Sequence, residues 1–206
     1  MPVSSVLSQW SGTLKYVRLA VLLALIGAPA SAQNIPTLYP TDEASVPFLF
    51  NGVPSSQLAN GAGYSDSISR FPNLDACRRQ LEPTEMAAHN PIQIDWKVAN
   101  TTRDVDVCIF RALTAIRDFN RGRVWLREQG FKVHEAHKYG ARLIINGSSS
   151  AKWRTYGAEI DKYRFREVFG VHMNLIQFWA LRGVSMQVSV DEFGYPKSVQ
   201  LMLNFE

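Results

Sequence analysis

The sequence predicts a single α+β domain, in which two or three helices pack on an antiparallel sheet and an irregular N-terminal arm precedes the domain. Apolar and polar residues alternate through residues 184–205, which is typical of a half-buried β-hairpin. Near the middle of the chain, apolar residues recur at spacings of three and four, which is typical of an amphipathic helix. A stretch rich in proline, glycine and serine comes before both.

Residues 1–32 are expected to be a secretory signal peptide. Lys15 and Arg18 are the only charged residues there, and an apolar run of about nine residues follows them. Small residues then lead to a predicted cleavage site between Ala32 and Gln33. The apolar run is well short of the roughly 20 residues that span a bilayer, although a retained signal anchor is an alternative. We therefore expect a soluble, exported mature protein.

The cleavage junction is typical of a bacterial protein, so we expect the mature chain in the periplasm, or secreted beyond it. A eukaryotic secreted protein is the competing interpretation. It would give a role to two N-glycosylation sequons, which begin at Asn100 and Asn146.

The charge of the mature chain is unevenly distributed. Removing residues 1–32 lowers the formal charge from +4 to +2, because Lys15 and Arg18 leave without any acidic residue. Residues 33–110 hold 5 basic and 9 acidic side chains, whereas residues 111–206 hold 15 basic and 9 acidic ones. We expect the positive surface to lie in the C-terminal part, and export makes nucleic acid an unexpected partner for it.

The two cysteines, Cys77 and Cys108, are predicted to form one disulfide bond, because both lie in the exported part of the chain. Two buried free thiols are the alternative. Neither cysteine belongs to a Cys-x-x-Cys motif, so we do not expect a redox enzyme.

Residues 33–75 are predicted to form an extended arm with at most short strands near residues 46–50. The arm contains five prolines and no lysine or arginine before Arg70. It could wrap the domain or reach a partner. Regular structure is expected to begin near Asp75, and the α+β domain to occupy residues 76–206.

The first half of the domain is expected to be mainly helical. Residues 74–81 suggest a short helix, and residues 92–98 a half-buried strand. Thr101 and Asp104 have the spacing of a capping box that starts a long helix with an apolar stripe. A shorter helix over residues 124–129 should end at Gly130.

The second half is expected to be richer in strands. Residues 131–137 and 142–146 are strand candidates, and residues 171–181 are predicted to form a helix closed by Gly183. The C-terminal hairpin turns over residues 191–196 and should place one face in the core.

Two short motifs suggest catalysis, but neither assigns a catalytic or metal site. His134 and His137 are three residues apart in a predicted strand, where they would point to opposite faces. Ser149 and Lys152 match Ser-x-x-Lys, but the companion motifs of penicillin-recognising enzymes are absent. We therefore expect no cofactor and no metal.

Two runs of alternating cations and aromatics form a candidate anion-binding face. Its cationic members are Lys152, Arg154, Lys162, Arg164 and Arg166. If both runs are strands, these cations share outward faces, and a bound anion would relieve their mutual repulsion. If residues 162–166 are helical, the charges spread around the helix axis. An ordinary solvated face is the alternative.

The sequence thus predicts an exported protein that acts by binding, as an accessory or assembly subunit at the bacterial cell envelope. Its partner would be an envelope protein or an anionic component such as a lipid head group or a glycan. A small periplasmic or secreted hydrolase of envelope polymer is the alternative. His134 or His137 within reach of a carboxylate in a cleft would favour the hydrolase, whereas a docked arm or an open positive face would favour the binding protein.

Overall fold

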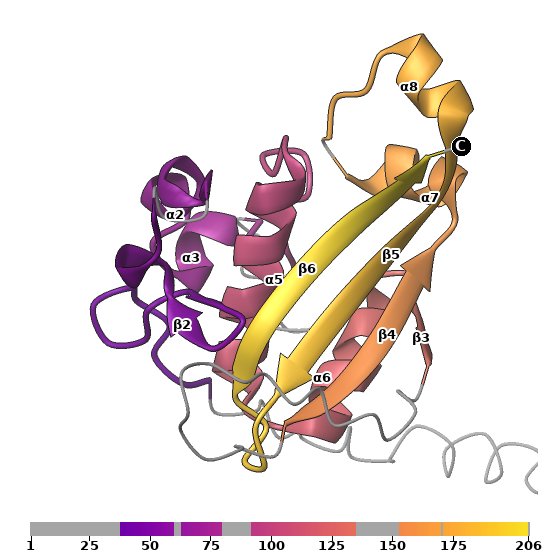
Figure 1. The fold of residues 1–206 in the computed structure, drawn as a ribbon. Coiled ribbons are helices and arrows are strands. Elements are labelled where there is room, and N and C mark those ends of the chain that lie inside the picture. Colours follow the sequence, from indigo (N-terminus) through magenta and orange to yellow (C-terminus); the bar gives the residue numbers. More distant parts are fainter. Residues whose placement is uncertain (1–37, 60–62, 80–91, 135–152, 170, 206) are drawn as a thin grey trace, which may run out of the picture. The chain divides into compact units, whose positions relative to one another are not determined.

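A four-stranded antiparallel sheet organises the protein, in a computed structural model that describes residues 38–59, 63–79, 92–134, 153–169 and 171–205. The strand order is β3-β4-β5-β6 (Figure 1). The strands are β3 (Lys132–His134), β4 (Arg154–Ile160), β5 (Leu181–Val190) and β6 (Pro196–Phe205). Six α-helices accompany it within the described residues, so the α+β class is confirmed, with more helices than expected.

The C-terminal hairpin has the predicted alternation and turn. Tyr156, Val188 and Val199 lie side by side on the three longest strands and are buried. The turn between β5 and β6 is closed by Asp191, whose Oδ1 accepts hydrogen bonds from the backbone N–H groups of Phe193 and Tyr195 at 3.0 and 2.9 Å. Gly194 has a φ of +87°, which only glycine adopts readily.

Helix α5 (Thr102–Ile116) is the centre of the core. The predicted capping box is present: Asp104 N–H donates to Thr101 Oγ1 at 3.1 Å, and Thr101 N–H donates to the Asp104 carboxylate at 2.9 Å. Every residue from Asp104 to Ile116 is buried, which is more than a single apolar stripe would produce. The helix is therefore covered on several sides, not only by the sheet.

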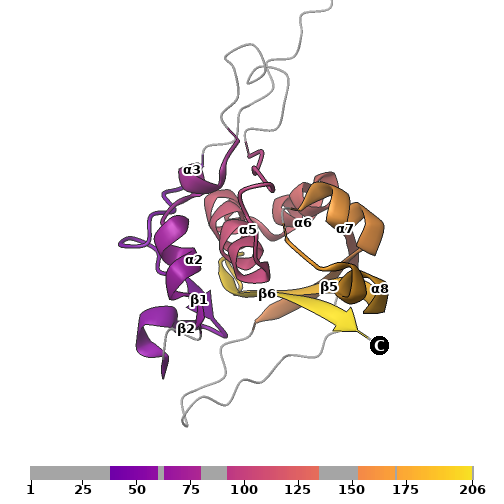
Figure 2. The same ribbon diagram turned by 90° about the horizontal axis from the view of Figure 1, so that it is seen from above.

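Helix α6 (Phe119–Glu128) lies beside α5 on the same face of the sheet (Figure 2). It begins five residues earlier than predicted, because Asp118 caps it by accepting a hydrogen bond from Arg121 N–H at 2.7 Å. As predicted, Gly130 follows its C-terminus, with a φ of +94°.

The described part of the N-terminal arm covers the other side of α5 (Figure 2). It forms β1 (Leu49–Phe50), β2 (Val53–Pro54), a 3-10 helix η1 (Ser55–Gln57), α2 (Ser65–Arg70) and α3 (Leu74–Cys77). The prediction that regular structure begins near Asp75 is therefore wrong. Arm residues Phe48, Tyr64 and Phe71 are buried in the main core, and this arrangement explains why α5 is enclosed.

The predicted disulfide is confirmed. Cys77 of α3 and Cys108 of α5 are bonded, with their Cα atoms 5.6 Å apart, and both are fully buried. The bond joins the end of the arm to the central helix.

Three other elements differ from the prediction. Residues 92–96 alternate in burial and Val98 is exposed, and the segment forms only a single bridge, between Ile94 and Arg78, in place of a strand. The helix predicted over residues 171–181 is limited to α8 (Leu175–Ala180), and Gly183 lies inside β5. Residues 142–146 lie outside the described residues, as does the part of residues 131–137 that follows His134.

Candidate functional site

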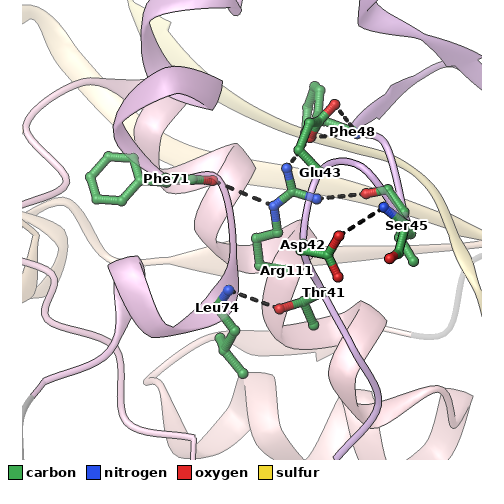
Figure 3. Close-up of polar contacts among 9 residues, drawn as sticks. Thr41, Asp42, Glu43, Ser45, Phe48, Phe71, Leu74 and Arg111 are labelled. Atoms are coloured by element: carbon green, nitrogen blue, oxygen red, sulfur yellow. Dashed lines mark hydrogen bonds and ion pairs between the residues drawn. The ribbon is translucent and has the colours of Figure 1, made fainter.

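Arg111 is fully buried, and it fastens the arm to α5 (Figure 3). Its Nε donates to Phe71 O at 3.4 Å, its Nη1 to Val46 O at 2.7 Å, and its Nη2 to the Glu43 carboxylate. Each of the three nitrogens is thus engaged by the protein itself. This cluster holds the arm on α5, so we assign it a structural role.

Asp106 joins the arm, α5 and the sheet in a second buried cluster. Its carboxylate accepts hydrogen bonds from Tyr64 Oη at 2.7 Å and from Leu201 N–H at 2.6 Å. Burial raises the pKa of Asp106 to about 8, against the opposing effect of these two donors and of Arg103. Burial also raises the pKa of Tyr64. Both groups are enclosed, so this cluster too is structural.

Helix α8 carries the largest group of exposed apolar side chains in the described part of the chain. Asn174 and Gln177 form a capping box that starts this helix, with hydrogen bonds of 2.8 and 3.1 Å. Three of its side chains face solvent: Leu175, Ile176 and Trp179 are 66%, 80% and 70% exposed. We call these three residues the α8 tip. In Figure 1 the helix projects beyond the ends of β5 and β6.

Two cations lie at the base of this tip. The only buried residue of α8 is Phe178, and its ring contacts the Arg166 guanidinium at 4.7 Å and the Lys162 ammonium at 5.6 Å. Both cations come from α7 (Lys162–Val168), one turn apart on the same side of the helix. We call Lys162 and Arg166 the cationic collar. No carboxylate within the described part of the chain is paired with Arg166.

The structure divides the predicted anion-binding face. Of the two alternatives for residues 162–166, the helix is present: they form α7, which Asp161 caps by accepting from Tyr163 N–H at 2.9 Å. Lys162 and Arg166 remain together, but Arg164 is paired with Glu167 at 2.9 Å. Phe165 is fully buried, whereas Tyr163 is exposed.

The other predicted cations are elsewhere. Arg154 begins β4, at the opposite end of that strand from α7, and its guanidinium lies 4.6 Å from the Phe119 ring. It also donates to Glu192 O at 3.2 Å. Lys152 lies outside the described residues.

The sequence did not reveal the α8 tip. The spacing of Leu175, Phe178 and Trp179 is that of one helical face, but only Phe178 is buried. The missed signal was the pair Asn174 and Gln177, whose capping box starts the helix at Leu175. A helix of six residues projecting from the sheet cannot bury a whole stripe.

His134 does reach a carboxylate, at 3.5 Å between its Nε2 and Glu159 Oε2. Both side chains are more than half exposed, at 58% and 64%. Glu159 also borders a pocket of about 360 Å³, together with Lys132 and Ser185. His137, Ser149 and Lys152 lie outside the described residues. Where the structure describes the chain, no cluster of three or more His, Cys, Asp or Glu could hold a metal ion.

Comparison with known proteins finds no match to this chain among family models, curated proteins or solved structures. Among the helices of the described residues, none is long and apolar enough to cross a membrane. The assignment of function therefore depends on the geometry of the surface.

Proposed function

We propose that this protein acts by binding, as an accessory protein that docks on an anionic lipid surface of the bacterial cell envelope. The observation that carries the proposal is the α8 tip, with its three exposed apolar side chains, beside the cationic collar. The packing of the arm against the domain supports a binding protein. Because the arm helps to fill the core, the side chains that could bind a partner lie on the surface.

A lipid surface suits the tip better than a protein partner does. A stable protein interface buries about 800 Å² on each side and is usually broad, whereas the tip is three side chains on a six-residue helix. Leu, Ile and Trp side chains of this kind insert readily at the level of lipid head groups, where tryptophan is enriched. Lys162 and Arg166 would then lie at the depth of the phosphates, where each cation contributes about 1 kcal/mol.

The disulfide supports a location outside the cytoplasm. Disulfide bonds such as Cys77–Cys108 persist in oxidising compartments, and the N-terminal 32 residues have the pattern of an export signal. Together these features support placement at the envelope, where anionic lipid is available.

Vesicle binding tests the proposal directly. The protein is purified in the form that the expressing bacterium produces. It is then mixed with vesicles of phosphatidylglycerol or of phosphatidylcholine alone. We expect co-sedimentation with the anionic vesicles, weakened by salt, and at least about tenfold weaker binding for a variant with Leu175→Ser, Ile176→Ser and Trp179→Ser. The Lys162→Gln and Arg166→Gln variant should lose most of the salt dependence.

Matched controls exclude general effects of exposed apolar or charged residues. Phe193 is 74% exposed in the β5–β6 turn, at the other end of the hairpin from α8, so Phe193→Ser removes an apolar side chain away from the tip. Arg121→Gln removes an exposed cation from α6. Equal binding by the tip variant and the Phe193→Ser variant would refute the proposal.

A hydrolase remains the second candidate, because His134 and Glu159 meet beside the 360 Å³ pocket. In that function His134 would be the general base and Glu159 would orient it. Release of soluble fragments from purified envelope polymer, abolished by His134→Ala and by Glu159→Gln, would establish it. The same release by both variants, or none by the parent protein, would exclude this site.

A further inference from the structure

A pocket lies directly beneath α8, between α7 and the segment that leads into α8. Its volume is about 300 Å³, at the lower end of the range for small-molecule sites. Four apolar side chains line it: Phe169, Val171, Met173 and Phe178. Phe169 is itself fixed in the core, where it stacks on Phe165 with ring centroids 4.8 Å apart. One wall is therefore rigid and apolar.

The remaining lining of the pocket is cationic or basic. Arg166 and His172 complete it, and both side chains are exposed. The Arg166 side chain is exposed, and its guanidinium lies 4.7 Å from the centre of the Phe178 ring. It is also one of the two collar cations. The pocket thus combines four apolar side chains with an exposed guanidinium.

This combination selects a ligand with two parts. An inorganic anion would leave the four apolar walls unused, and a neutral hydrocarbon would leave the guanidinium unused. A flexible chain suits the small volume better than a fused ring system does. Guanidinium groups bind phosphate strongly, through charge-assisted hydrogen bonds.

We propose that this pocket binds one hydrocarbon chain of an anionic phospholipid, with the phosphate on Arg166. The inference rests on the proposed docking for the source of the lipid, because the tip and collar place the mouth of the pocket at the bilayer surface. It goes further in assigning a separate site for an individual chain. Docking through the tip alone would need no such site.

Titration with soluble alkyl phosphates tests the pocket without a bilayer. Dodecyl phosphate, below the concentration at which it forms micelles, is titrated into the protein by calorimetry. We expect saturable binding that strengthens about threefold to fourfold for each added methylene between octyl and dodecyl phosphate. Inorganic phosphate should show no comparable binding. The absence of any chain-length dependence would overturn the inference.

Three variants locate the site. Met173→Trp fills the pocket and Arg166→Gln removes the guanidinium, and each should weaken binding of dodecyl phosphate by about tenfold or more. Phe193→Ser removes an exposed apolar side chain away from the pocket, so it should bind as the parent does. If Met173→Trp does not fold, as judged by circular dichroism, the Arg166→Gln variant and the chain-length series still test whether the pocket binds the alkyl phosphate. Unchanged binding by Arg166→Gln would place the ligand elsewhere.

The two proposals can fail separately. Vesicle binding without alkyl phosphate binding would refute the pocket and leave the docking intact, whereas the reverse would refute the docking alone. Tighter binding of laurate than of dodecyl phosphate would show that a free fatty acid, and not a phospholipid, is the preferred occupant.

Discussion

The guanidinium of Arg111 pairs with the carboxylate of Glu43, 68 residues earlier in the chain. The Arg111 side chain is fully buried, and its other nitrogens bond to backbone carbonyl oxygens of the same arm. Residues that the sequence presents as an irregular arm are in this way part of the folded core.

We expect Arg111→Met to destabilise the protein by about 2–4 kcal/mol. The change leaves the Glu43 carboxylate and the oxygens of Val46 and Phe71 without their donor. Urea denaturation measures the loss, and Arg121→Met is the control because Arg121 is exposed on α6. Identical midpoints for the two variants would show that the arm does not depend on Arg111.

Reduction of the disulfide should lower the free energy of unfolding by about 3–4 kcal/mol. Cys77 and Cys108 are 31 residues apart, and closing a loop of that length restricts the unfolded chain by roughly this amount. Denaturation of the parent with and without a reductant measures the effect. The doubly substituted Cys77→Ala, Cys108→Ala variant should not respond to the reductant, and a response there would point to another cause.

Stability should decrease as the pH rises from about 4 to about 8, because of Asp106. Burial raises the pKa of Asp106 to about 8 in the folded protein, whereas an unfolded aspartic acid has a pKa of about 3.9. Between these values the folded state binds the proton more tightly, so deprotonation removes stability, by at most about 1.4 kcal/mol per pH unit.

The variant Asp106→Asn isolates this effect. Its amide can still accept from Leu201 N–H and can donate to Tyr64 Oη, but it does not titrate. The difference in unfolding free energy between parent and variant should therefore change with pH between about pH 5 and about pH 8. A constant difference across that range would contradict the raised pKa.

Two residues of α8 should differ in how much the same substitution destabilises the protein. Ile176→Ser should change stability by less than about 0.5 kcal/mol, because the side chain faces solvent. Phe178→Ser should cost about 2–4 kcal/mol, because the ring is buried against α7 and holds α8 in place. Thermal unfolding measures both, and equal losses would mean that the tip is buried.

Features determined by neighbouring residues could be predicted from the sequence. The capping box of α5 needs only Thr101 and Asp104, and the last turn needs only Asp191 and Gly194. The strand period of the hairpin is likewise local, since successive side chains point to opposite faces. The disulfide followed from the number of cysteines and their expected compartment.

The candidate site could be predicted only in part. Lys162 and Arg166 were identified as cationic candidates, but a run of five alternating residues is too short to distinguish a strand from a helix. The spacing of Phe165 and Phe169, four residues apart and both buried, favours the helix that is present. The exposure of Ile176 and Trp179 could not be predicted, because it depends on which distant elements cover a helix face.

The sequence by itself determined the class of the fold, the hairpin, the central helix and the cysteine pair, because local spacing encodes them. Only the tertiary structure decided that the arm encloses α5 through Arg111 and that α8 projects with its apolar residues uncovered. It also decided which cations lie together, as Lys162 and Arg166 do. Burial and surface charge depend on contacts between segments that are far apart in the chain, and no local pattern specifies those contacts.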